Sequence, residues 1–187
     1  QNYLHNLQFL AATYAELNEY EHAFSTAEAY AKLALKTGGG SNSSDLLLNY
    51  KGRIMPALVN MRFCKYKAAT SNLDFWLSAM DPPIHDPLTI NYLKGMREYC
   101  IGMRAVRAGK EEVAIRASKS MEGYVAAYKT AVGTERNGEE MRHINENYDL
   151  LMMSWYQLVG WGVNMDATKE FIADPWEKAF ALEAALG

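Results

Sequence analysis

The chain has 187 residues, of which 49% are hydrophobic and 22% are charged, and 19 Lys and Arg against 22 Asp and Glu leave a formal charge of −3. This length predicts one domain or one short repeat array, large enough to fold without disulfides or a structural metal. The near-neutral charge argues against a nucleic-acid-binding protein, because such proteins normally carry a basic excess. Two cysteines are too few for a disulfide framework.

Apolar residues recur every three or four positions along almost the whole chain, which predicts amphipathic helices and no strands. In the first segment the residues that share one helical face are Leu4, Leu7, Leu10, Ala11, Tyr14 and Leu17. The second segment has a stripe of small residues that lets two helix axes approach closely, namely Ala23, Ala27, Ala31 and Ala34.

Glycine and proline divide the rest of the chain. A flexible loop over residues 38–45 precedes the third helix, in which Pro56 predicts a kink or a break. Three prolines between residues 82 and 87 end the fourth helix, and Gly109 ends the fifth. Asp174 and Pro175 predict the start of a final helix, so we expect about eight helices in short-looped pairs.

The longest run without a charged residue lies between Asp149 and Asp166. Its 16 residues are fewer than the ~20 that a membrane-spanning helix needs. We therefore predict a buried helix and no membrane insertion. The chain begins at Gln1 without a signal region, and we expect part of a longer protein that resides in the cytoplasm.

An internal repeat with a period of 45–46 residues relates three segments of the chain. A small residue recurs where two helices should cross, at Ala11, Ala57 and Gly102. An alanine recurs early in each second helix, at Ala23, Ala69 and Ala114. A turn is centred near Asn18, Cys64 and Gly109. Asn and Gly suit a turn with a positive φ, whereas Cys does not.

These residues resemble the tetratricopeptide repeat (TPR), a helix–turn–helix unit. The matching positions in the first copy are Leu7, Leu10, Ala11, Tyr14, Tyr20 and Ala23, and those in the third are Ile101, Gly102, Gly109 and Ala114. The segments 3–10 and 62–66 are also similar to a group of uncharacterised bacterial repeat proteins, a likeness that brings no activity with it. The period here is longer than the usual ~34 residues.

The resemblance implies an all-α fold, a right-handed superhelix of about four antiparallel helix hairpins. We expect a single TPR-like domain over residues 1–187, with hairpins at about 3–36, 44–80, 88–132 and 138–186. Proteins of this kind are non-catalytic scaffolds that bind a partner segment in a concave groove. We expect a protein or peptide partner, no nucleic acid and no cofactor.

The helix faces that remain once the packing stripe is assigned predict which residues line that groove. The first hairpin contributes His5, Gln8, Ala12 and Glu16, and the third contributes Tyr99, Met103, Val106 and Arg107. Tyr, Met and Arg often carry binding energy at interfaces. The alternative for Tyr99 and Met103 is ordinary core packing, which aromatic and Met stripes at helical spacing usually indicate.

A helical enzyme or metal-dependent domain is an alternative function. Two Glu-x-x-His spacings, Glu19 with His22 and Glu140 with His143, place a carboxylate and an imidazole on one helix face. His85 lies between two aspartates in the proline-rich loop. We favour solvated surface residues and connector chemistry for all of them, and predict no metal site. A third possibility is an oligomerising tail of a longer protein, and hence a homo-oligomer.

Overall fold

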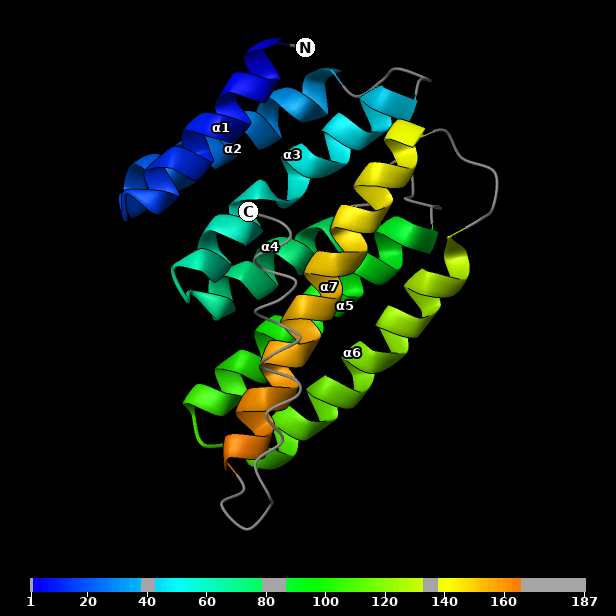
Figure 1. Ribbon diagram of the computed structural model, residues 1–187. Coiled ribbons are helices and arrows are strands. Elements are labelled where there is room, and N and C mark those ends of the chain that lie inside the picture. Colours follow the sequence, from blue (N-terminus) through cyan, green and yellow to red (C-terminus); the bar gives the residue numbers. More distant parts are fainter. Residues whose placement is uncertain (1, 38–42, 79–86, 133–137, 166–187) are drawn as a thin grey trace. The chain divides into compact units, whose positions relative to one another are not determined.

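The computed structural model describes residues 2–37, 43–78, 87–132 and 138–165, and all regular structure in that part is α-helical. Figure 1 shows its helices, which are α1 (Asn2–Glu16), α2 (Tyr20–Thr37), α3 (Ser43–Arg62), α4 (Tyr66–Ser78), α5 (Pro87–Arg107), α6 (Glu111–Ala131) and α7 (Gly138–Met165). The prediction of an all-α chain is confirmed for these residues. The final helix expected near Asp174 and Pro175 lies outside them.

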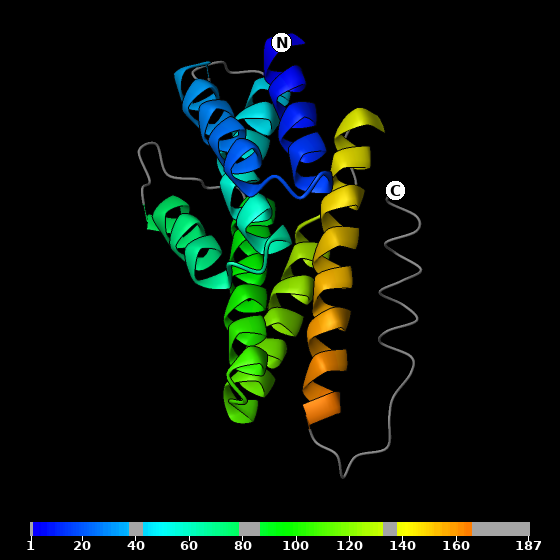
Figure 2. The same cartoon turned by 90° about the vertical axis from the view of Figure 1, so that its left-hand side faces the viewer.

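The chain divides into two compact units, unit 1 at Gln1–Ala79 and unit 2 at Met80–Gly187. In unit 1, α3 packs against both helices of the preceding hairpin, α1 and α2, and also against α4. In unit 2, α5, α6 and α7 lie side by side and each contacts the other two (Figure 2). Among the described residues, no helix has the length and apolarity required to cross a membrane.

The alanine stripe of α2 forms the centre of unit 1, as predicted. Ala23, Ala27 and Ala34 are at most 1% exposed, and they cluster with Ala11 of α1 and with Met55 and Val59 of α3. Small side chains on α2 leave room for the larger residues of α3, so the axes of the two helices can approach closely.

Two apolar residues of α1 are exposed, and Pro56 does not divide α3. Leu10 and Leu17 belong to the apolar pattern of α1, yet they are 42% and 62% exposed. A periodic stripe predicts a buried face only where a neighbouring element covers it, and no described element of unit 1 covers these two. Helix α3 continues through the buried Pro56, so of the two predicted effects of this proline the break is wrong.

All three predicted turns close in the same way. In the first, the Asn18 N–H donates to the Ala15 carbonyl (3.1 Å) and the Glu19 N–H donates to the Tyr14 carbonyl (2.8 Å). This pair of bonds is the Schellman motif, which ends a helix with one residue in the left-handed conformation. The same pair recurs around Cys64, with the Lys65 N–H on the Asn60 carbonyl (2.7 Å), and around Gly109.

The left-handed residues are Asn18 (φ 61°), Cys64 (φ 56°) and Gly109 (φ 65°). The turn position was therefore predicted correctly in each copy, but the expectation that Cys64 does not suit a positive φ is overridden. A non-glycine residue in this conformation costs roughly 1–2 kcal/mol. The packing of α3 and α4 around the turn outweighs that cost.

We expect Cys64→Gly to raise the free energy of unfolding by about 1 kcal/mol, because glycine adopts this φ without strain. Gly109→Ala should lower it by a similar amount. Urea unfolding of the full chain measures both changes. Cys64→Ser is the matched control, since serine keeps a Cβ at the strained position and should bring no such gain. Equal stability of the Gly and Ser variants would contradict the interpretation.

Unit 2 depends on two glycines of α5 that face α7. A Cβ at Gly95 would lie 2.5 Å from Cδ1 of Leu151, and one at Gly102 would lie 2.6 Å from both Cδ atoms of Leu158. Both leucines are fully buried. The two glycines are seven positions apart on α5, and the two leucines are seven positions apart on α7. Seven residues make about two helical turns. Helix α7 therefore packs along α5 in the same direction, with each leucine seated over a glycine.

Candidate partner-binding surface

The predicted groove residues are divided between the two units. Gln8 and Glu16 lie on α1 of unit 1, where Gln8 is half-buried and Glu16 is exposed. The side chain of His5, also on α1, is outside the described part. Tyr99, Met103 and Arg107 lie on α5 of unit 2.

Glu16 forms an exposed ion pair with Arg62, whose Nη2 lies 3.1 Å from Oε2 of Glu16. The two residues are 46 positions apart, which is one repeat period, so they occupy equivalent positions on α1 and α3. The first helices of the two hairpins therefore lie in register at this end of unit 1. An exposed pair of this kind adds little stability, but it places a carboxylate and a guanidinium side by side on the surface.

The turn end of unit 1 holds an aromatic cluster centred on Tyr20. Its ring stacks on Phe24 with a centroid separation of 5.6 Å and meets Phe63 edge-on at 5.1 Å. The ammonium of Lys65 lies 3.1 Å from the centroid of the Tyr20 ring. A cation over an aromatic face is attracted by the ring quadrupole. This cluster joins the first hairpin to the second.

Asn60 is the polar centre of the same region and is 1% exposed. Its Oδ1 accepts a hydrogen bond from the Tyr20 hydroxyl (3.0 Å), and its Nδ2 donates to Oδ1 of Asn72 (2.8 Å). Asn60 therefore links α2, α3 and α4. Helical periodicity alone does not mark Asn60 as buried. The signal available was an Asn where the first copy has the aromatic Tyr14.

In unit 2, Tyr99 and Met103 are 9% and 7% exposed. The Tyr99 hydroxyl donates to Oε1 of Gln157 on α7 at 3.1 Å. Both side chains thus take part in packing, as the core alternative described. Arg107 is exposed at the end of α5 and is the member of this set that a partner can reach without rearrangement of the helices.

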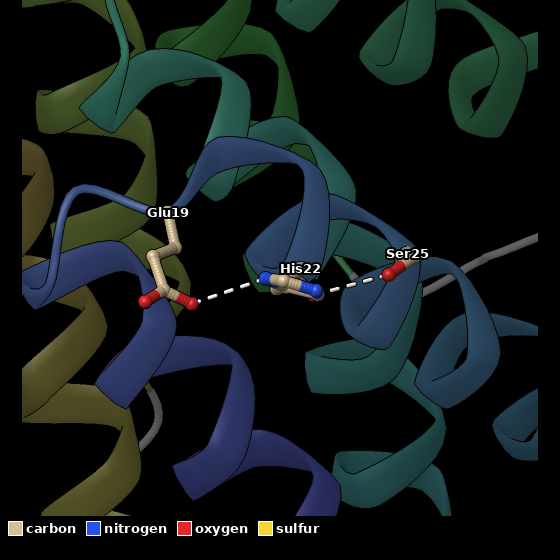
Figure 3. Close-up of polar contacts among 3 residues, drawn as sticks. All are labelled: Glu19, His22 and Ser25. Carbon is tan, nitrogen blue, oxygen red and sulfur yellow. Dashed lines mark hydrogen bonds and ion pairs between the residues drawn. The ribbon is translucent and has the colours of Figure 1, made fainter.

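Glu19 and His22 form a local pair at the start of α2 (Figure 3). His22 Nδ1 lies 3.0 Å from Glu19 Oε2, and the two side chains are 68% and 46% exposed, respectively. The Ser25 hydroxyl donates to the backbone carbonyl of His22 (3.2 Å), and the His22 ring lies 5.1 Å from the Tyr14 ring. A carboxylate at a helix N-terminus also stabilises the helix dipole.

The remaining candidate residues for catalysis or metal binding are His85, Glu140, His143 and the cysteines. His85 lies outside the described residues, as do the side chains of Glu140 and His143. Within residues whose positions are described, no three His, Cys, Asp or Glu side chains lie close enough together to hold a metal ion. Burial raises the pKa of the Cys100 thiol to about 12, so it stays protonated and is a poor nucleophile at neutral pH.

Comparison of the chain with protein-family models, with curated protein sequences and with solved structures gives no significant match.

Proposed function

We propose that the chain is a TPR-like helical repeat, a right-handed superhelix of hairpins that binds a segment of a partner protein without catalysis. The observation that supports this proposal most is the identical Schellman turn at Asn18, Cys64 and Gly109. Each turn is followed by a buried alanine, at Ala23, Ala69 and Ala114. Hairpins related in this way hide their apolar faces by stacking and expose extended surfaces for partners.

The proposed binding surface on unit 1 follows α1 and the register-equivalent residues of α3. Gln8, Ala12 and Glu16 are spaced by four residues and so share one face of α1. Their equivalents one period later are Ile54, Leu58 and Arg62. Leu58 is half-buried, and the Glu16–Arg62 pair borders the surface. A segment with an apolar residue flanked by charges of both signs fits this composition.

In unit 2, Arg107 is the exposed member of the predicted groove residues. Tyr99 and Met103 are buried, and their replacement would disturb packing between α5 and α7 before it altered a surface. Arg107 occupies the same repeat position as Glu16 and Arg62. We propose that this position carries charged contacts to a partner in the first three hairpins.

A selection of displayed peptides against the full chain tests the proposal. We expect peptides that bind with micromolar Kd and lose at least tenfold in affinity to Ala12→Arg, because the long side chain would cover the surface between α1 and α3. Isothermal calorimetry measures that loss. Ala29→Arg is the matched control, since Ala29 is an exposed alanine on α2. Peptides that bind both variants equally well, or no selected peptides at all, would overturn the proposal.

A further inference from the structure

One side of α1 is apolar and exposed. We call it the α1 edge and define it by Phe9, Leu10, Thr13 and Leu17. Phe9 is 60% exposed, Leu10 is 42% exposed and Leu17 is 62% exposed. Phe9 and Thr13 lie on the side of α1 opposite to the buried Leu4 and Ala11, and Leu10 and Leu17 lie at the border between the two sides. The α1 edge therefore contributes little to the packing of its own hairpin.

The repeat register identifies what the α1 edge corresponds to in the second hairpin. One period of 46 residues takes Phe9, Thr13 and Leu17 to Met55, Val59 and Phe63 of α3. Met55 and Val59 are 8% and 3% exposed. They pack in one cluster with the alanines of α2. In α3, these positions are the face that packs against the preceding hairpin.

A separate contact of Phe63 also shows that this face of α3 packs against the preceding hairpin. Its ring meets the Tyr20 ring of the first hairpin at 5.1 Å, and its equivalent on α1 is the exposed Leu17. The fold of a hairpin does not by itself require large apolar residues here, because the third copy has Cys100, Arg104 and Ala108 at these positions. The apolar residues of the α1 edge thus match those of a helix that docks on another hairpin.

We propose that the α1 edge is a docking surface for a further helical hairpin of the same repeat type, held as the first hairpin holds α3. The surface that α3 meets is the alanine stripe of α2, so the docked hairpin has small residues at the places of Ala23, Ala27 and Ala34.

The charge of Glu16 indicates which residue the docked hairpin carries at the equivalent position. Arg62 of α3 pairs with Glu16 of the first hairpin, and the two residues are register equivalents. Glu16 on the α1 edge side would therefore meet the same repeat position of the docked hairpin. A basic residue there is attracted, whereas a second copy of this first hairpin would place Glu16 against Glu16. The occupant is a hairpin with an Arg or Lys at this position. This interface shares Glu16 with the proposed groove, but Phe9 and Leu17 belong to the α1 edge alone, so different substitutions test the two proposals.

An extended chain tests the inference. Residues 2–47 carrying Glu16→Arg are joined ahead of Asn2 of the full chain, so that equivalent positions of the added hairpin and α1 are 46 residues apart, as they are between the first hairpin and α3. We expect amide hydrogen exchange in the original α1 to slow by about tenfold or more, because the helix becomes an internal element of the stack. Phe9→Asp with Leu17→Asp in the original α1 should abolish this slowing.

The controls use residues of similar exposure. Phe75 on α4 is 56% exposed and lies outside the α1 edge, so Phe75→Asp should leave the slowing intact. An added hairpin that keeps Glu16 should protect α1 less than the Arg version. The Phe9→Asp, Leu17→Asp chain without the extension should keep its unfolding midpoint, which shows that it folds.

Unchanged exchange in α1 after extension, or slowing that survives Phe9→Asp with Leu17→Asp, would overturn the inference. Light scattering of the unextended chain tests whether a second copy of the chain covers the α1 edge. A dimer that these two substitutions convert to a monomer would show that a second copy covers the α1 edge instead.

Discussion

Replacement of Gly102 by valine is expected to lower the free energy of unfolding by about 3 kcal/mol. A Cβ at this position would lie 2.6 Å from both Cδ atoms of Leu158 and 3.1 Å from its Cγ. Leu158 is fully buried, so the clash falls within a packed interior. Overpacking of a filled core costs roughly 1–3 kcal/mol and occasionally more. Urea unfolding of the full chain measures the change.

A double-mutant cycle assigns the effect to the contact between α5 and α7. Leu158→Ala alone should cost about 3 kcal/mol, since it leaves a cavity over Gly102. In the Gly102→Val background, the same truncation also relieves the clash. The two losses should therefore fall short of additivity by about 1 kcal/mol or more. Additive losses would show that the valine acts on the α5 helix alone.

Two other glycines provide graded controls. Gly123 on α6 has no atom within 4 Å of the position of an added Cβ. Gly123→Ala should thus stabilise the chain by up to about 1 kcal/mol through helix propensity. At Gly95 the added Cβ would clash with a single Leu151 methyl group. The free energy of unfolding of Gly95→Ala should therefore lie between those of Gly102→Val and Gly123→Ala. A Gly102→Val variant as stable as Gly123→Ala would contradict the packing described.

The turns and the alanine stripe were predictable because they depend on local properties. A turn of three residues between helices that closes with a Schellman motif needs one left-handed residue, and the repeat spacing marks Asn18, Cys64 and Gly109 regardless of residue type. Ala23 and Ala27 sit where two helices cross, and small residues at helical spacing indicate close approach. Neither feature requires knowledge of residues far along the chain.

The faces of α1 and α5 could not be assigned in this way. Periodicity shows that a helix has an apolar face, but it does not show how many neighbours the helix has. Helix α5 packs against both α6 and α7, so its buried arc widens to include Tyr99 and Met103. Leu10 and Leu17 on α1 present the opposite case, an apolar pattern exposed within unit 1. In both cases the tertiary neighbours decide, and sequence spacing does not encode them.

Asn60 was missed as a structural centre because its partners are distant in sequence. Tyr20 lies 40 positions before it, and Asn72 lies 12 positions after it. A buried Asn is costly without hydrogen bonds, yet nothing in the local pattern of α3 marks it as buried. Only the hairpin packing brings these three side chains together.

Asn60→Asp is expected to destabilise the chain by about 3 kcal/mol at pH 7. The aspartate can still accept the Tyr20 hydroxyl, but it cannot donate to Oδ1 of Asn72, which then faces a second oxygen. A carboxylate at a position that is 1% exposed is also poorly solvated, and an uncompensated buried charge costs several kcal/mol. Chemical unfolding at pH 7 measures the loss relative to the unsubstituted chain.

The pH dependence of this loss identifies its cause. Burial should raise the folded-state pKa of the introduced carboxyl above its unfolded value of about 4. The penalty is therefore small below pH 4, where the neutral carboxyl can donate to Asn72, and it grows as the pH rises through the unfolded pKa toward the folded one. Asn72→Asp is the matched control, because Asn72 only accepts in this pair and is half-buried. A loss from Asn72→Asp as large as that from Asn60→Asp, or a loss independent of pH, would contradict the hydrogen-bond directions described for this junction.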